Sequence, residues 1–232
     1  MFRFKQFEIH DELSAMKIGT DGVLLGAWVD VADAHSILDV GTGTGLVAIM
    51  CAQRNAQARV HGIDIVEDAA TEAQQNMART AWCDRLSAEH ADLRDYDPDV
   101  RFDHIVSNPP FFLTTLQSPD ATRAMARHAD TLPYADLVSA AERLLTPSGR
   151  LSVVLPTECA ATFRRVAFER LWLSRITDVV TREGEAPKRT LMEFRLSAKP
   201  LMPCADSITV QAKDGSYTEE YRRLTEEFYL NF

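Results

Sequence analysis

The sequence of 232 residues lacks any apolar run long enough to cross a membrane, for which about 18 consecutive residues are needed. Its N-terminus, residues 1–10, mixes Phe with Arg, Lys and Glu and lacks the apolar stretch of a secretory signal, so no leader is expected. Internal repeats and low-complexity segments are also absent. With 46% hydrophobic and 25% charged residues, the composition is that of a globular protein, which argues against disorder and a coiled coil.

Cysteine is scarce, and its four positions follow no metal-binding pattern: Cys51, Cys83, Cys159 and Cys204. No two of them form a Cys-x-x-Cys pair, and none has a histidine at the spacing of a zinc ligand. We therefore expect no metal site. Reduced thiols are typical of a cytoplasmic protein, which is the location that we predict.

The net charge of −9 argues against a nonspecific nucleic-acid binder. The charge is unevenly distributed, however, because residues 121–199 hold 13 basic and 9 acidic side chains while the remainder is strongly acidic. This part of the chain is a candidate basic face on an acidic protein. An ordinary solvated surface is the alternative explanation.

From residue 36 onward, segments typical of strands and helices alternate. This order predicts an α/β fold with a parallel sheet covered by helices on both faces. We expect one domain over residues 1–232, in which 1–35 form an extension and 36–232 the core. The predicted strands are 36–40, 59–65, 87–91, 102–107, 150–155, 174–181 and 189–197. The predicted helices are 46–54, 67–80, 134–145 and 157–170, with a short apolar helix within 19–28.

A glycine-rich turn follows the first of these strands, in Asp39-Val40-Gly41-Thr42-Gly43-Thr44-Gly45. Glycines allow close approach of the backbone to a ligand, and the following helix presents free N–H groups. A dinucleotide fingerprint would require a third glycine at Leu46. The spacing instead resembles motif I of class I S-adenosylmethionine (SAM) methyltransferases, in which the acid orients the amino group of the cofactor. A tight turn without a ligand remains the alternative.

Two further acids follow the next two strands. Asp64 lies 23 residues after Gly41, a separation that suits an acid bound to the ribose hydroxyls of a nucleoside. Such an acid would serve SAM and NAD equally well. The resemblance to SAM methyltransferases implies that Asp92 binds the adenine amino group of the cofactor. Either acid could instead be an ordinary surface residue.

The fourth predicted core strand runs into Asn108-Pro109-Pro110-Phe111. The prolines fix the backbone and remove two N–H donors, so the Asn108 amide oxygen and the Pro109 carbonyl become rigid acceptors. Beside an aromatic ring, two acceptors suit a planar exocyclic amino group such as adenine N6. The pattern resembles the signature of amino-methyltransferases that act on adenine, cytosine, guanine or glutamine amide nitrogens. A rigid structural loop is the alternative.

Segments at the two ends of the chain make the resemblance more specific. Residues 4–7, 15–28 and 217–230 are similar to the corresponding segments of the bacterial tRNA1(Val) (adenine(37)-N6)-methyltransferases. This resemblance implies SAM as the methyl donor, adenine 37 in the anticodon loop of a valine tRNA as substrate, and a doubly wound, mostly parallel, seven-stranded sheet. It also implies that the extension 1–35 lies over the cofactor site.

The candidate residues form three groups under this interpretation. The catalytic candidates are Asn108, Pro109, Pro110 and Phe111. The cofactor candidates are Asp39, Gly41, Gly43, Asp64, Asp92 and Asn108, with Lys17 and Asp21 as weaker ones. The candidates for tRNA phosphates are Arg123, Arg127, His128, Arg182, Lys188 and Arg189, because their positions reach over the carboxyl edge of such a sheet.

Three other functions remain open. An amino-methyltransferase of a ribosomal guanine or a protein glutamine would share every catalytic residue. A nonenzymatic SAM-binding or nucleotide-binding module would not need an intact Asn-Pro-Pro-Phe. An NAD oxidoreductase is disfavoured by Leu46 and by the lack of a catalytic Tyr-x-x-x-Lys. The sequence leaves the oligomeric state undetermined.

Overall fold

The computed structural model describes residues 1–14, 17–109 and 132–231, and its central feature is an eight-stranded sheet. Five of the strand pairs are parallel, whereas β9 pairs antiparallel with both of its neighbours. In spatial order the strands are β10 (Cys204–Gln211), β8 (Trp172–Arg182), β9 (Arg189–Arg195), β7 (Leu145–Pro156), β6 (Phe102–Ser107), β3 (Ser36–Val40), β4 (Arg59–Asp64) and β5 (Leu86–His90).

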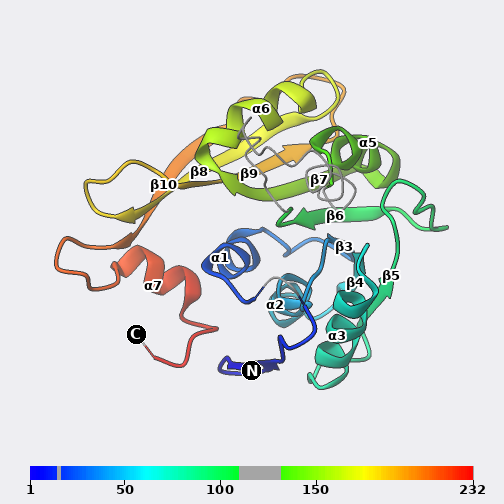
Figure 1. The fold of residues 1–232 in the computed structure, drawn as a ribbon. Helices are drawn as coiled ribbons and strands as arrows, with labels where there is room; N and C mark the ends of the chain where they lie inside the picture. The colour runs from blue at the N-terminus through cyan, green and yellow to red at the C-terminus, as the bar shows by residue number, and fades with distance from the viewer. Residues whose placement is uncertain (15–16, 110–131, 232) are drawn as a thin grey trace, which may run out of the picture.

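Helices cover both faces of the sheet (Figure 1). One face carries α5 (Tyr134–Leu144) and α6 (Thr157–Ala167), which build one apolar core with the sheet. The other face carries α1 (Thr20–Trp28), α2 (Leu46–Arg54), α3 (Glu67–Ala78) and α7 (Glu219–Thr225), which contribute to the second core. No helix in the described ranges is long and apolar enough to span a bilayer.

The doubly wound, mostly parallel fold that the sequence predicts is confirmed. The predicted strands and helices agree with the structure to within about three residues, except that β7 begins at Leu145, ahead of the predicted strand 150–155. The predicted number of seven strands is wrong, because β10 adds an eighth strand beside β8. The first four residues of β10 are exposed, so this strand lacks the apolar pattern of a core strand. A small antiparallel pair, β1 (Phe2–Arg3) and β2 (Glu8–Ile9), also forms in the N-terminal extension.

Helices α1 and α2 pack in close contact because a glycine faces a methionine between them. A Cβ atom added at Gly26 would lie 2.7 Å from the sulfur of Met50, so no larger residue fits there without displacing that side chain. The apolar residues of α1 are almost completely buried, including Leu24, Leu25 and Trp28. These side chains therefore belong to the apolar core of the protein.

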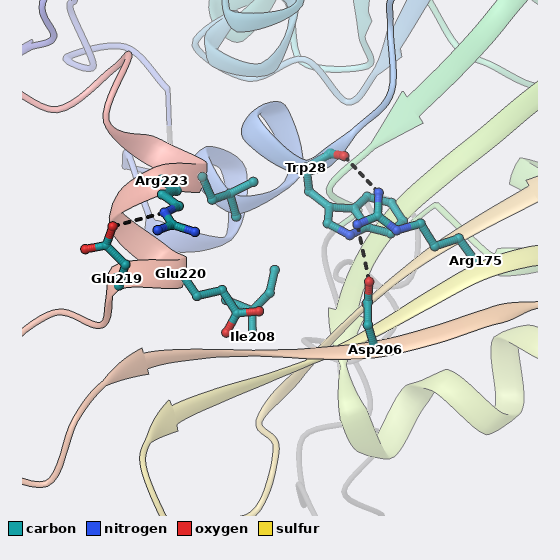
Figure 2. Close-up of a pocket in the computed structure, with 8 residues that line it drawn as sticks. Trp28, Arg175, Asp206, Ile208, Glu219, Glu220 and Arg223 are labelled. Atoms are coloured by element: carbon teal, nitrogen blue, oxygen red, sulfur yellow. Dashed lines mark hydrogen bonds and ion pairs between the residues drawn. The ribbon is translucent and has the colours of Figure 1, made fainter.

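The last strand is attached to the rest of the molecule around Trp28 (Figure 2). The indole nitrogen of Trp28 donates a hydrogen bond to the hydroxyl of Thr177 on β8 at 2.8 Å. The guanidinium of Arg175 lies 4.3 Å from the centre of the Trp28 ring and 3.6 Å from a carboxylate oxygen of Asp206 on β10. These contacts line a cavity of about 690 Å³ between α7 and the sheet, and they connect β10 to α1 across β8.

The two ends of the chain are in contact with each other. The ring of Phe4 stacks on Phe7 and Tyr229, with ring centroids 4.6 and 6.0 Å apart respectively. The backbone N–H of Lys5 donates to the carbonyl of Phe228 at 2.8 Å. The terminal segments that carry the family resemblance therefore form one structural unit in space.

We predict that Phe4→Ala lowers the free energy of unfolding by about 3–5 kcal/mol, because the 2%-exposed ring would leave a cavity between the chain ends. Phe168→Ala is the matched control. Its ring is 62% exposed, so we expect a loss below about 1 kcal/mol. Urea unfolding of both variants measures the difference, and equal losses would show that the contact between the chain ends adds little stability.

Candidate functional site

A cavity of about 550 Å³ lies where β3, β4 and β6 end. Its wall combines the glycine loop after β3, the residues after β4 and β5, the residues after β6, and part of the N-terminal extension. Ser14 and residues 17–19 are the parts of the N-terminal extension that begin this stretch of the cavity wall. Crevices at this edge of open α/β sheets are the usual ligand sites.

The glycine loop turns sharply because three of its residues have positive φ angles. These are 69° at Gly41, 55° at Gly43 and 82° at Gly45, a region that other residues rarely adopt. The N–H groups of Gly41 and Thr42 donate to the carbonyl of Ile63 at 2.9 and 3.0 Å, which fixes the loop to the end of β4. A Cβ atom at Gly41 or Gly43 would meet no atom within 4 Å, so the loop presents bare backbone to open space at the cavity.

Asp39, the last acid before this loop, is completely buried beneath it and lines the cavity. One carboxylate oxygen accepts hydrogen bonds from the Thr42 hydroxyl at 2.8 Å and from the Ala48 N–H at 3.2 Å. Burial raises the pKa of Asp39 to about 7, because the charged form loses its hydration. The site therefore holds a carboxyl group that titrates near neutrality.

Asp64 links the end of β4 to the glycine loop. One of its oxygens accepts from the Gly43 N–H at 2.9 Å, and the other accepts from the Val66 N–H at 2.9 Å. The carboxylate is thus held at the cavity wall by two backbone donors and is only partly buried. This arrangement leaves lone pairs on both oxygens for a further donor.

Asp92, after β5, also lines the cavity and forms an ion pair with Arg94. The Arg94 side-chain Nε lies 2.9 and 3.0 Å from the two carboxylate oxygens. This hydrogen bonding from Arg94 lowers the pKa of Asp92. Arg94 itself lines the cavity and was not among the predicted residues. Nothing in the sequence distinguishes it from the other charged residues of that loop.

Asn108 lies directly after β6 and lines the cavity beside Pro109. Its amide oxygen Oδ1 is buried and has no hydrogen-bond partner within the part of the chain that the structure describes. An unpartnered buried acceptor is costly, which makes it a strong indication of a missing donor. Pro110 and Phe111, the remaining catalytic candidates, lie outside the described residues.

The two weaker cofactor candidates lie in different surroundings. Lys17 lines the cavity, and its ammonium group donates to the carbonyls of Asp11 and Ser14. Asp21 does not line the cavity. Its carboxylate accepts a hydrogen bond from Nε of Arg189 at 2.7 Å, which ties the start of α1 to the start of β9.

Comparisons with known proteins agree with this site. The family model of the methyltransferase small domain matches residues 14–169. A tRNA1(Val) (adenine(37)-N6)-methyltransferase from Phocaeicola vulgatus is 44% identical over 99% of this chain and 97% of its own length. The protein of the same name from Vibrio campbellii is 41% identical over 99% of this chain and 95% of its own length. The chain belongs to the tRNA1(Val) (adenine(37)-N6)-methyltransferase family.

Solved structures support the same fold for this family member. A predicted O-methyltransferase from Agrobacterium tumefaciens has a TM-score of 0.71 at 22% identity, covering 90% of this chain and 96% of that one. The N-methyltransferase NodS from Bradyrhizobium japonicum, in complex with S-adenosyl-L-homocysteine, has a TM-score of 0.52 at 18% identity and covers 74% of this chain and 83% of that one. At these identities the likeness concerns the fold alone.

The basic residues proposed for tRNA are only partly placed in this member of the tRNA1(Val) (adenine(37)-N6)-methyltransferase family. Arg182 ends β8, and Lys188 and Arg189 precede and begin β9, so all three flank the turn between these strands. Lys188 is exposed and forms an ion pair with Glu185 at 3.1 Å. The other three candidates, Arg123, Arg127 and His128, lie outside the described residues. Within the described ranges, no group of three or more His, Cys, Asp or Glu residues is placed to hold a metal ion.

We predict that Asp39 makes the stability of the ligand-free protein depend on pH. Its pKa is raised in the folded state, so between about pH 4 and pH 7 the folded protein retains a proton that the unfolded chain has released. Raising the pH through this range therefore lowers the free energy of unfolding, by at most about 1.4 kcal/mol per pH unit.

The Asp39→Asn variant keeps an acceptor for Thr42 and Ala48 but cannot ionise. Urea unfolding of both proteins from pH 4 to pH 8 should show the wild type losing stability relative to the variant as the pH rises. Parallel curves over this range would show that the Asp39 carboxyl does not titrate there.

Proposed function

We propose that the protein transfers a methyl group from SAM to N6 of adenine 37 in a valine tRNA. The single observation that carries this proposal is the unpartnered Oδ1 of Asn108 at the wall of the carboxyl-edge cavity. It is a hydrogen-bond acceptor without a donor, at the end of the strand where an amino-group substrate would bind. The chain's membership of the tRNA1(Val) (adenine(37)-N6)-methyltransferase family supplies the identity of that substrate.

The cavity suits SAM by size and by the chemistry of its donors and acceptors. Ligand sites commonly have volumes of about 300–1,000 Å³, and this cavity has about 550 Å³. The glycine loop offers bare backbone, and acidic oxygens are available for a cationic amino group, ribose hydroxyls and an adenine amino group. The residues that would hold the cofactor are Asp39, Gly41, Gly43, Asp64, Asp92, Asn108 and Lys17. When bound, SAM supplies an electrophilic methyl group on a positively charged sulfur.

Ionised Asp39 would balance the positive charge of the cofactor's amino group. Its raised pKa means that a bound cation, by favouring the carboxylate, lowers the pKa again. Asp64 would accept from ribose hydroxyls with the lone pairs that the two backbone N–H groups leave free. Asp92 would accept from the adenine amino group in competition with Arg94, so Arg94 would shift when the site fills.

The chain's own contribution to the chemistry is to position and polarise the target amino group. The lone pair of adenine N6 is delocalised into the ring, which makes it a poor nucleophile. Hydrogen bonds from N6–H to Asn108 Oδ1 and to the Pro109 carbonyl would hold the nitrogen in line and favour a lone pair aimed at the methyl group. The same two acceptors would stabilise the positive charge that develops on N6. Phe111 lies outside the described residues, and its role is proposed from the sequence alone: its ring would stack on the base.

Adenine 37 suits this chemistry because it lies in an unpaired loop. A loop base can be turned into a pocket with less loss of stacking and pairing than a duplex base. Basic side chains near the carboxyl edge would bind the tRNA backbone; the proposed set is Arg123, Arg127, His128, Arg182, Lys188 and Arg189. Arg189 would act from its ion pair with Asp21. With tRNA as the substrate, the location that we propose for the reaction is the cytoplasm.

We expect Asn108→Ala to lower kcat by about 10²–10³-fold and to raise the Kd for SAM far less, because the lost acceptor serves mainly the transition state. Asn108→Asp keeps an acceptor at the same place and should retain much more activity than Asn108→Ala. Mass spectrometry of nucleosides from unmodified valine tRNA measures N6-methyladenosine, and calorimetry measures SAM binding.

Three outcomes separate the possible functions. N6-methyladenosine formed by the wild type and lost in Asn108→Ala supports both the reaction and the acceptor. Equal activity of Asn108→Ala and wild type would refute the role of Asn108. SAM binding without methylation of any tRNA would leave the methyltransferase site in place and direct the search to ribosomal guanines and protein glutamines.

We expect Arg182→Ala and Lys188→Ala each to weaken tRNA binding several-fold at low salt without changing the Kd for SAM. If each removes one phosphate contact, the slope of log K against log salt concentration falls in magnitude by about 0.7–0.9 per residue. Arg223→Ala on α7, whose partner is Glu219, is the control and should leave the slope unchanged. Salt titrations of tRNA binding test this, and unaltered slopes in both variants would remove these residues from the proposed interface.

A further inference from the structure

A buried polar face of α3 holds the N-terminal extension against the cofactor cavity. Glu72 and Asn76 are one helical turn apart and are 2% and 0% exposed, respectively. Both side chains reach across to backbone groups of the extension, nearly sixty or more residues earlier in the chain. Buried polar side chains of this kind are costly unless every contact is made, so their bonds fix the geometry firmly.

The Glu72 carboxylate accepts hydrogen bonds from two successive backbone N–H groups. One carboxylate oxygen accepts from Leu13 at 2.7 Å and the other accepts from Ser14 at 2.8 Å. Burial by itself would raise the pKa of Glu72, but the N–H groups of Leu13 and Ser14, together with the Ser14 hydroxyl beside the carboxylate, outweigh it and bring the pKa below its ordinary value. The carboxylate is therefore charged at neutral pH and forms two charge-assisted bonds.

Asn76 joins the extension to the glycine loop. Its amide oxygen accepts from the His10 N–H at 3.0 Å, and its amide nitrogen donates to the His10 carbonyl at 2.8 Å. The same nitrogen donates to the carbonyl of Thr44 in the glycine loop at 2.9 Å. One side chain thus fixes two walls of the cavity relative to each other.

Ser14 is where this arrangement reaches the cavity. It lines the cavity and is 3% exposed, and its hydroxyl lies beside the Glu72 carboxylate without forming a well-aligned hydrogen bond to any described residue. Asn108 is the only other cavity residue in the described ranges that has a buried side-chain atom without a well-aligned hydrogen bond. A buried hydroxyl without a well-aligned hydrogen bond indicates a ligand that supplies one.

We propose that Ser14 is a further binding residue for the cofactor, and that Glu72 and Asn76 are the positioning residues that hold it in place. The inference rests on the proposed function, because it takes SAM as the occupant of the cavity. It predicts that the Ser14 hydroxyl contributes more to the affinity for SAM than to the stability of the ligand-free protein.

The Ser14→Ala variant separates these two effects. Loss of one neutral hydrogen bond should raise the Kd for SAM and for S-adenosylhomocysteine by about 2–12-fold. The Tm of the ligand-free protein should change little, because the hydroxyl makes no well-aligned hydrogen bond there. Calorimetry gives both Kd values and thermal unfolding gives the Tm. An unchanged Kd for SAM, whatever the Tm, would overturn the role of Ser14.

Glu72→Gln and Asn76→Asp test the positioning residues. We expect each to raise the KM and Kd for SAM by about tenfold, with kcat and the KM for tRNA within about twofold of the wild type. Gln75→Ala, exposed on the same helix, is the matched control and should leave all four constants unchanged. If the role of these residues were purely structural, the variants would have a lower activity per milligram of protein and a lower Tm, with an unchanged KM for SAM. That result would overturn the proposal.

If either α3 variant fails to fold, the Ser14→Ala result decides alone, since that change leaves every backbone bond in place. SAM binding by the wild type distinguishes a failure of the proposed function from a failure of this inference. A wild type that does not bind SAM would refute the proposed function and with it this inference. A wild type that binds SAM beside a Ser14→Ala variant of equal affinity would refute the inference and leave the proposed function standing.

Discussion

The parallel pairing of β3 with both β4 and β6 is the constraint on which the rest of the site depends. Val40 pairs with Ile63 on one side and with Ser107 on the other, so the three strands end at the same level of the sheet. The glycine loop, Asp64 and Asn108 therefore meet at one edge. A shift of the register by one residue would move their side chains to the opposite face and separate them.

Three aspartates at this edge differ in the surroundings that the fold gives them. Asp39 is buried beneath the glycine loop, and its pKa is raised to about 7. Asp64 is held by two backbone N–H groups. Asp92 is paired with Arg94, and this pairing lowers its pKa. The same residue type thus supplies a titrating group, a fixed acceptor and an acceptor with a competing partner, because burial and donors differ at each position.

The N-terminal extension both lines the cavity and packs against the C-terminal segment. Its first residues pack against the C-terminal segment through Phe4 and Tyr229, and its later residues form part of the cavity wall. Between these points, α3 holds it by side-chain bonds to its backbone. Bonds of this kind depend on backbone position more than on the identity of the residues held, so the sequence of residues 10–14 carries little trace of them.

Local patterns in the sequence determined the order of strands and helices, the glycine loop and the Asn-Pro-Pro-Phe segment, because hydrophobic period, backbone freedom and fixed φ angles act over a few residues. The tertiary structure alone decided what depends on distant partners. It added β10, whose exposed half lacks a core pattern, and it paired Asp21 with Arg189 across 168 residues. It also set the pKa of Asp39 and joined Glu72 to Ser14, since burial and hydrogen-bond partners arise only when separate segments pack together.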